Sequence, residues 1–143
     1  MIANMINTKE YLVIDLARAA GVSTDAVRFY TKKELLKPTR NTMNNYKIYH
    51  PADLIRLRFI CRAKILGYTL GEIKQIIHAS EKKQAPCPRV REIIKKRIRE
   101  NKHQFNEAIA LQKRMEAALK QWEHMDDAIP IGDSICHLIE SVT

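Results

Sequence analysis

Apolar residues recur at helical spacing along most of the chain and alternate, as they would in a strand, over only one short stretch. The apolar positions Leu12, Leu16 and Ala20 predict a short helix that ends at Gly21. Ser23 or Thr24 can cap a second helix, whose apolar positions at helical spacing continue to Tyr30. Two short helices joined by a tight turn are typical of a helix-turn-helix.

The one strand-like stretch reads RNTMNNYKIYHP and spans residues 40–51. Residues 46–49 alternate in polarity, and Asn44 and Asn45 favour a turn immediately before them. This pattern predicts a small hairpin, or wing, after the helix-turn-helix.

Two further helices are predicted after the wing. The first spans about 52–66 and is stopped by Gly67. The second spans about 70–79, and Thr69 and Glu72 have the spacing of a capping box at its start. Together these elements predict a winged helix-turn-helix domain over residues 1–80.

A long and mostly charged helix, predicted over 88–123, follows a polar hinge at 81–87. One narrow apolar stripe runs along it, formed by Val90, Ile94, Ile98, Phe105, Ala108, Leu111, Met115, Leu119 and Trp122. No other predicted helix is long enough to cover this stripe, so we expect it to pair with an identical copy. Asn101 interrupts the stripe, either to fix the register or as a tolerated defect. A loop and a last short helix, starting near Asp133 or Ser134, complete residues 124–143.

The predicted fold is therefore mainly all-α, and its charge is unevenly distributed. The 143 residues carry a net charge of +9, and residues 1–80 hold 13 Lys or Arg against 6 Asp or Glu. Residues 121–143 contain five acidic residues and no Lys or Arg. A solvated basic surface is one explanation, and a surface that meets a polyanion is the other. No nucleophile–base pair, glycine-rich phosphate loop or paired carboxylates indicate an enzyme.

The three cysteines, Cys61, Cys87 and Cys136, are an odd number without close spacing. No basic-then-apolar leader begins the chain, and no apolar run approaches the ~20 residues of a membrane span. We therefore expect a cytoplasmic protein with reduced thiols.

The order VIDLARAAGVSTDAVRFYTKKELLKP, then NNYKIYHPADLIRLRFICRAKILGYTLGEIKQII, then a long helix resembles the MerR family of transcription regulators. The resemblance implies a homodimer joined by an antiparallel coiled coil, with a winged helix-turn-helix that binds palindromic promoter DNA. It also implies an activator that distorts the promoter so that RNA polymerase can use it.

Carried onto this chain, the resemblance assigns DNA binding to the second helix and to the wing, at Val27, Arg28, Tyr30, Asn45, Tyr46 and Lys47. Arg56 and Arg58 on the third helix are candidates for phosphate contacts or simple surface charges. Two positions depart from the family pattern, which usually has Arg at position 47 and an acid at position 31. Lys47 keeps the charge but not the two-pronged geometry of Arg. Thr31 leaves the packing of its helix open.

The resemblance also implies a metal site at the start of the long helix, where Cys87 would reach the loop after that helix in the other copy. A cysteine at this position favours a divalent ion. The candidate ligands in the loop are Cys136, His137, His124 and Asp126. Metal sensors for mercury, lead and cadmium in the family have a further cysteine here, so nitrogen and oxygen ligands favour Zn, Ni or Co.

Each of these residues also has a structural explanation. Cys87 can be an ordinary loop thiol, Cys136 a small buried residue, and His124 and Asp126 part of a hydrated acidic cap. Cys61 is expected to pack in the core. A thiol sensor of electrophiles or oxidants on the same scaffold is the alternative function, with neighbouring Lys and Arg favouring a reactive thiolate at Cys87.

Overall fold

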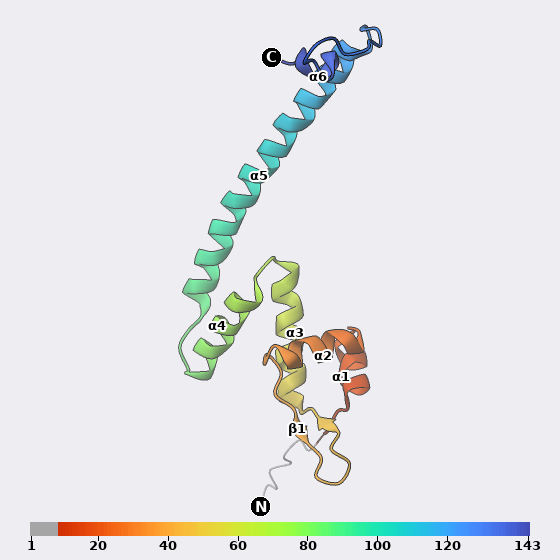
Figure 1. The fold of residues 1–143 in the computed structure, drawn as a ribbon. Coiled ribbons are helices and arrows are strands. Elements are labelled where there is room, and N and C mark those ends of the chain that lie inside the picture. Colours follow the sequence, from red (N-terminus) through yellow and green to blue (C-terminus); the bar gives the residue numbers. More distant parts are fainter. Residues whose placement is uncertain (1–8) are drawn as a thin grey trace, which may run out of the picture. The chain divides into compact units, whose positions relative to one another are not determined.

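The computed structural model describes residues 9–143. The chain is mainly helical with one two-stranded sheet, as predicted (Figure 1). Its elements are α1 (Val13–Ala20), α2 (Thr24–Lys32), β1 (Thr39–Arg40), β2 (Lys47–Ile48), α3 (Pro51–Ile65), α4 (Leu70–Glu81), α5 (Cys87–Trp122) and α6 (His137–Glu140). Two compact units divide after Ile94.

The first unit packs α1 and α2 against α3, with α4 and the start of α5 completing its core (Figure 1). The residues with no exposed surface come from nearly every element of the unit: Leu16, Val27, Tyr49, Leu57, Ile60 and Ile73. Burying an aliphatic side chain of this size stabilises a fold by about 1.5–3 kcal/mol. The core therefore holds the helix-turn-helix and the sheet as one body.

The two helices of the helix-turn-helix begin and end where their capping residues predict. Gly21 has a φ of 70°, a left-handed conformation that favours glycine, and it ends α1. The Ser23 hydroxyl accepts a hydrogen bond from the Ala26 amide at 3.1 Å and begins α2. These local signals confirm the predicted turn between the helices.

The helices α3 and α4 also begin with side-chain caps. Asp53 accepts a hydrogen bond from the His50 amide at 2.9 Å, one residue before Pro51 opens α3. Thr69 and Glu72 exchange two bonds of 3.1 and 2.8 Å, the capping box predicted for α4. The predicted helix α4 was two residues too short, since it continues to Glu81.

Thr31 has a specific partner in the fold. Its hydroxyl lies 2.7 Å from the phenol oxygen of Tyr49, whose side chain is fully buried. The same hydroxyl donates to the Val27 carbonyl at 2.8 Å. Tyr49 in turn pairs with Tyr11 through two backbone hydrogen bonds of 2.8 Å. Because the Thr31 hydroxyl donates to Val27, the Tyr49 hydroxyl donates to Thr31, and this bond accommodates the departure from the family pattern at position 31.

The helix α5 contains 36 residues and extends about 54 Å at the usual rise of 1.5 Å per residue. Its first two turns belong to the first unit, because Ile93 is buried in that core and the Tyr68 hydroxyl donates to the Val90 carbonyl at 2.8 Å. Beyond Ile94 the apolar stripe is exposed: Ile98 by 61%, Phe105 by 65% and Met115 by 55%. The stripe is therefore available to a partner, and its pairing with another copy stays a prediction.

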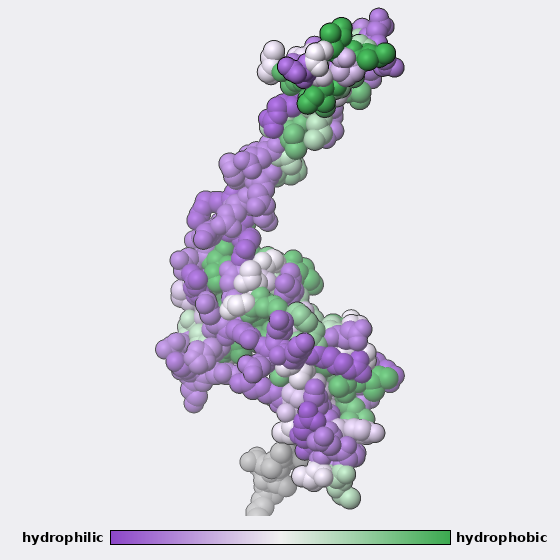
Figure 2. Space-filling view, viewed as in Figure 1, coloured by the Kyte–Doolittle hydropathy of each residue, from purple (hydrophilic) through white to green (hydrophobic). Residues whose placement is uncertain are grey.

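The last helix, α6, begins at His137 rather than near Asp133 or Ser134, so that prediction was wrong. Glu140 explains the later start, because its carboxylate accepts hydrogen bonds from the Ser134 hydroxyl at 2.6 Å and the Ile135 amide at 2.9 Å. These bonds tie residues 134 and 135 to the last residue of α6. On the face shown in Figure 2, hydrophobic residues gather over the C-terminal segment, where Ile129, Ile131, Ile135, Ile139 and Val142 are exposed. No helix within residues 9–143 is both long and apolar enough to cross a membrane.

Candidate DNA interface and metal centre

The outward face of α2 presents a cation and an aromatic ring. Arg28 is exposed and pairs with Asp25, one turn earlier, at 3.3 Å. Phe29 is 45% exposed and meets Tyr30 edge to face, with ring centroids 5.4 Å apart. Burial raises the pKa of Tyr30, and the neighbouring Cys61 thiol adds to the shift, so the phenol stays neutral and can donate a hydrogen bond. Arg28 is thus available on this face, and Tyr30 partly so.

Val27 does not belong to this outward face. Its side chain has no exposed surface and packs in the core of the first unit. A residue in that position cannot contact a DNA groove while the unit is folded. The structure therefore corrects the assignment of Val27, which supports α2 from beneath.

The wing is a short antiparallel hairpin with a well-defined tip. Arg40 pairs with Lys47 across the two strands, so two cations lie side by side. The amides of Met43 and Tyr46 donate to the side chains of Asn41 and Asn44, at 2.8 and 3.0 Å.

Asn45 lies at the end of that tip with a φ of 60°. The left-handed conformation is one that asparagine tolerates, which fits the turn predicted at Asn44 and Asn45. Tyr46 next to it is 61% exposed, and Lys47 is half-buried. A cross-strand pair of like charges is unfavourable in isolation and favours an anionic partner.

Arg56 and Arg58 both have partners within the chain. Arg56 forms a 2.6 Å ion pair with Glu81 at the end of α4, and its side chain is only 26% exposed. Arg58 is exposed and donates to the Ala19 carbonyl at the end of α1, at 3.3 Å. Arg58 therefore remains open to solvent, whereas Arg56 is held by a carboxylate.

The three cysteines lie in different environments. Cys87 is the first residue of α5 and is exposed, while Cys136 is half-buried in extended backbone immediately before α6. Cys61 is half-buried against the core, and burial raises the pKa of its thiol. The raised pKa keeps Cys61 protonated at neutral pH, which agrees with its predicted place against the core.

His137 is oriented by a hydrogen bond within the C-terminal segment. Its Nε2 atom lies 3.0 Å from the carbonyl oxygen of Asp126. A carbonyl only accepts, so Nε2 carries the proton in this contact, and in the neutral ring Nδ1 is left with a lone pair. An imidazole whose other nitrogen donates to a carbonyl is the usual form of a metal-binding histidine.

The candidate ligands are only partly brought together. Cys136 and His137 are adjacent, and His137 contacts the backbone rather than the carboxylate of Asp126. His124 and Asp126 are exposed after the end of α5. Within the described part of a single copy, no three His, Cys, Asp or Glu side chains are placed to share a metal ion.

Two residues at these sites were not found from the sequence. Glu81 holds Arg56 across 25 positions, so only the packing of α4 beside α3 reveals the pair. Glu140 holds Ser134 and Ile135, the two residues before Cys136. The pKa of its carboxyl group is lowered mainly by the hydrogen bond from the Ser134 hydroxyl and then by the one from the Ile135 amide. An acid in the first turn of a short helix was the one signal available for Glu140.

Comparison with known proteins identifies the scaffold. The family model described as MerR HTH family regulatory protein matches residues 11–80, and the model described as MerR, DNA binding matches residues 54–121. The HTH-type transcriptional regulator ZntR of Escherichia coli K12 is 26% identical over 74% of this chain and 76% of its own.

A ZntR homolog of Haemophilus influenzae is 29% identical over 59% of this chain. The aligned part spans 63% of that relative, which is less than two thirds of its length. The crystal structure of PbrR691 from Ralstonia metallidurans CH34, in complex with lead(II), shares the fold with a TM-score of 0.70. It is 24% identical and covers 92% of this chain and 98% of its own. The matched family models, which together span the helix-turn-helix, the wing and most of α5, show that this chain belongs to the MerR family of DNA-binding transcription regulators.

Proposed function

We propose that the protein is a metal-responsive transcription regulator whose homodimer binds palindromic promoter DNA and senses a divalent Zn, Ni or Co ion. The ion would be held between Cys87 of one copy and Cys136 of the other, with His137, His124 or Asp126 completing the site. The observation that carries this proposal is the His137 ring, which the Asp126 carbonyl holds through Nε2 and which is next to Cys136 in the sequence. The similarity to ZntR supports it.

The ligand types fit a borderline divalent ion. Thiolate, imidazole and carboxylate together suit Zn, Ni or Co, whereas softer ions prefer sulfur alone. A single copy brings no three such groups together within residues 9–143, so a complete centre draws on two copies. When bound, the ion would supply a cross-link between the first turn of α5 and the C-terminal segment of the other copy.

The dimer in this proposal forms through the exposed stripe of α5. Leu111, Met115 and Leu119 are each 45–56% exposed in the single chain. Covering them with an identical helix removes apolar surface from water, which contributes about 25 cal/mol per Å². An antiparallel pairing places the end of one α5 beside the start of the other, as a shared metal centre requires.

The first turns of α5 connect that centre to the DNA-binding elements. Cys87 lies one turn before Val90, whose carbonyl accepts the Tyr68 hydroxyl from the corner between α3 and α4. Ile93 anchors the next turn in the core. A displacement at Cys87 is therefore passed to α3 and α4 through packed side chains rather than through a flexible linker. This coupling supports an activator that changes promoter shape for RNA polymerase.

On the proposed interface, Arg28 and Tyr30 of α2 enter the major groove, and Asn45, Tyr46 and Lys47 of the wing contact the backbone. Arg56 and Arg58 add phosphate contacts. The exposed arginine on α2 and the cationic hairpin support these roles.

Metal content tests the proposed centre directly. Anaerobically purified protein is expected to bind one Zn, Ni or Co ion per site in competition experiments. The variant C87S/C136S is expected to lose that ion while remaining dimeric, because α5 is unchanged. The control variant C61S keeps the ion, since the Cys61 thiol is protonated and packs against the core.

The same preparation separates the proposal from a thiol sensor. If C87S/C136S retains one ion per site, the ligand assignment fails. If the wild-type protein binds no metal but forms a covalent adduct at Cys87 or Cys136 after aldehyde treatment, detected by mass spectrometry, the protein is a thiol sensor instead.

A further inference from the structure

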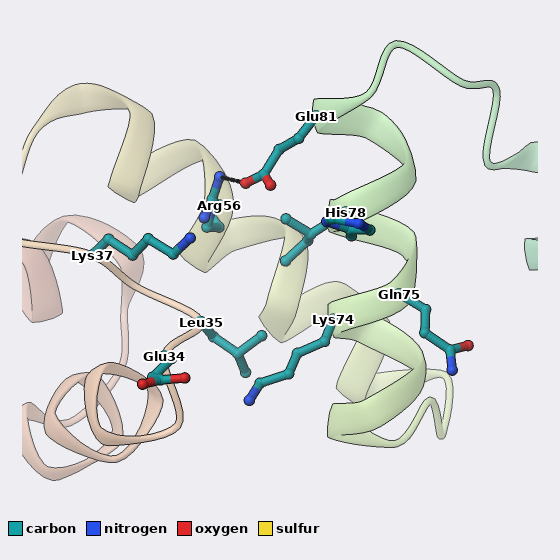
Figure 3. A pocket seen from close by; sticks show the side chains of 9 residues that line it. Glu34, Leu35, Lys37, Arg56, Lys74, Gln75, His78 and Glu81 are labelled. Carbon is teal, nitrogen blue, oxygen red and sulfur yellow. Dashed lines mark hydrogen bonds and ion pairs between the residues drawn. The ribbon is translucent and has the colours of Figure 1, made fainter.

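A hollow of about 370 Å³ lies in the first unit between α4, α3 and the segment that joins α2 to β1. Figure 3 shows Lys37 and Lys74 extending into it from opposite sides, with Arg56 on α3. His78 also lines the hollow. Cations from three separate elements therefore surround one space, which favours an anion.

Two acids, Glu34 and Glu81, also line the hollow, and one of them is engaged with a cation. Glu81 holds the Arg56 guanidinium at 2.6 Å, as the dashed line in Figure 3 shows. Carboxylate and phosphate oxygens meet a guanidinium with the same two-pronged geometry. The Glu81 carboxylate therefore occupies the position on Arg56 that a phosphate would take.

The hollow borders the two elements assigned to DNA. Lys37 comes from the short segment between the end of α2 and the start of the wing. That segment is tied to α3, because the Lys37 amide donates to Asp53 at 3.4 Å. Lys37 therefore lies in the chain between the two elements that the proposed function assigns to DNA.

We propose that this hollow seats a backbone phosphate of bound DNA, with Lys37, Lys74 and Arg56 as its contacts, and that Glu81 holds Arg56 until the phosphate displaces it. The inference rests on the proposed DNA-binding function and adds Lys37, Lys74 and Glu81 to it. A second copy covering the hollow, or a free inorganic anion in it, are the competing occupants.

Displacement of Glu81 has a consequence for the neighbouring connection. Glu81 is the last residue of α4, and six residues later Cys87 begins α5. Release of the Arg56–Glu81 pair therefore frees the end of α4 next to the proposed metal centre. DNA occupancy and the position of Cys87 become linked through one ion pair.

Affinity for a random-sequence duplex of about 30 bp, measured from about 50 to 200 mM salt, tests the seat, because phosphate contacts are independent of sequence. R56Q is expected to reduce the slope of log affinity against log salt by about 0.9, the value for one lost phosphate. E81Q is expected to bind about 2–5-fold more tightly, since the DNA no longer has to break a surface ion pair. That gain is expected to vanish in E81Q/R56Q.

The control variant is E92Q, which removes an acid paired with Arg89 at 3.1 Å on the exposed surface of α5. It should leave duplex affinity unchanged. If E81Q still raises the duplex affinity in the R56Q background, the gain comes from the change in net charge. That result would overturn the proposed phosphate site. Thermal melts confirm that each variant is folded.

Four further outcomes would overturn the proposal, each in a different way. If R56Q and E81Q alter the dimer dissociation constant in sedimentation but not the DNA affinity, a second copy covers the hollow. A second result would be that inorganic phosphate stabilises the wild-type protein but not R56Q at matched ionic strength, while R56Q keeps the wild-type slope of log duplex affinity against log salt. In that case the hollow binds a free anion rather than a DNA phosphate. Unchanged R56Q and E81Q affinities overturn the seat alone, whereas a wild-type chain that binds no duplex overturns the proposed function.

Discussion

The hydrogen bond between Thr31 and the buried Tyr49 holds the DNA-binding elements together. Thr31 is in the last turn of α2, and Tyr49 follows the second strand of the wing. Their hydroxyls meet at 2.7 Å where Tyr49 is fully buried. The bond therefore joins the recognition helix to the base of the wing, and a buried hydroxyl without its partner is costly.

We predict that T31V destabilises the protein by about 1–3 kcal/mol, because it leaves the buried Tyr49 hydroxyl without Thr31. Urea unfolding measures this change. T31S keeps the hydroxyl and is expected to cost less. The double variant T31V/Y49F removes both polar groups and is expected to recover most of the loss; if it does not, the hydrogen bond is not the cause.

Glu140 provides the corresponding contact in the C-terminal segment. Hydrogen bonds from the Ser134 hydroxyl and the Ile135 amide lower the pKa of its carboxyl group below the usual 4.5. A carboxyl with a lowered pKa stabilises the fold above its unfolded pKa, and this contribution is lost as the pH falls through the folded value. The hydrogen bonds from residues 134 and 135 to Glu140 should therefore persist at neutral pH and break in acid.

The amide resonance of Ile135 reports this opening. Its chemical shift is expected to titrate with a midpoint below 4.5, and the E140Q variant is expected to show no such step. An Ile135 midpoint above 4.5 in the wild-type protein would show that the carboxylate is not held by these bonds.

At the level of elements, α5 has two different parts. Its first turns are packed in the first unit through Ile93 and the Tyr68–Val90 bond, whereas its apolar stripe beyond Ile94 is exposed. An exposed helix with one apolar stripe is stable only when the stripe is covered. On the proposed function, the second part of α5 is therefore the part that pairs two copies.

Replacing Leu111 with Asn should weaken the dimer. A buried Leu truncated at a core position costs about 2–5 kcal/mol, and the two-fold pairing introduces the change twice, so we expect at least a 100-fold increase in the dimer dissociation constant. Sedimentation equilibrium measures this constant.

The matched control is K113N, two positions along α5 and therefore on a different face from Leu111. It should leave the dimer intact. If L111N and K113N dissociate equally, the stripe is not the interface.

The capping residues explain why most elements were predictable from the sequence. Gly21, Ser23 and the Thr69–Glu72 box act within four residues, so their signals are local and their helices begin where they indicate. The start of α6 was missed because it depends on Glu140 bonding back to Ser134. Val27 is an apolar periodic position of α2 and is buried, so its assignment to DNA came from the family resemblance rather than from helical periodicity.

At the level of the whole molecule, the site residues are harder to predict than the elements. The Arg56–Glu81 pair depends on how α3 and α4 pack, and the Thr31–Tyr49 bond joins residues 18 apart. The centre that we propose for metal depends on a second copy, so no spacing within one chain can describe it. The family models identify the scaffold, but they do not give the ligands of the proposed centre.

The anchoring of Ile93 has a practical consequence for protein engineering. Ile93 is buried in the first core, and the hydroxyl of Tyr68 needs the carbonyl of Val90. A fragment that ends with α4 would lose Ile93 from that core and the Val90 carbonyl that Tyr68 contacts. A fragment that ends after Ile94 retains both contacts. On the proposed function, such a fragment would bind half of the operator without the avidity of two linked copies.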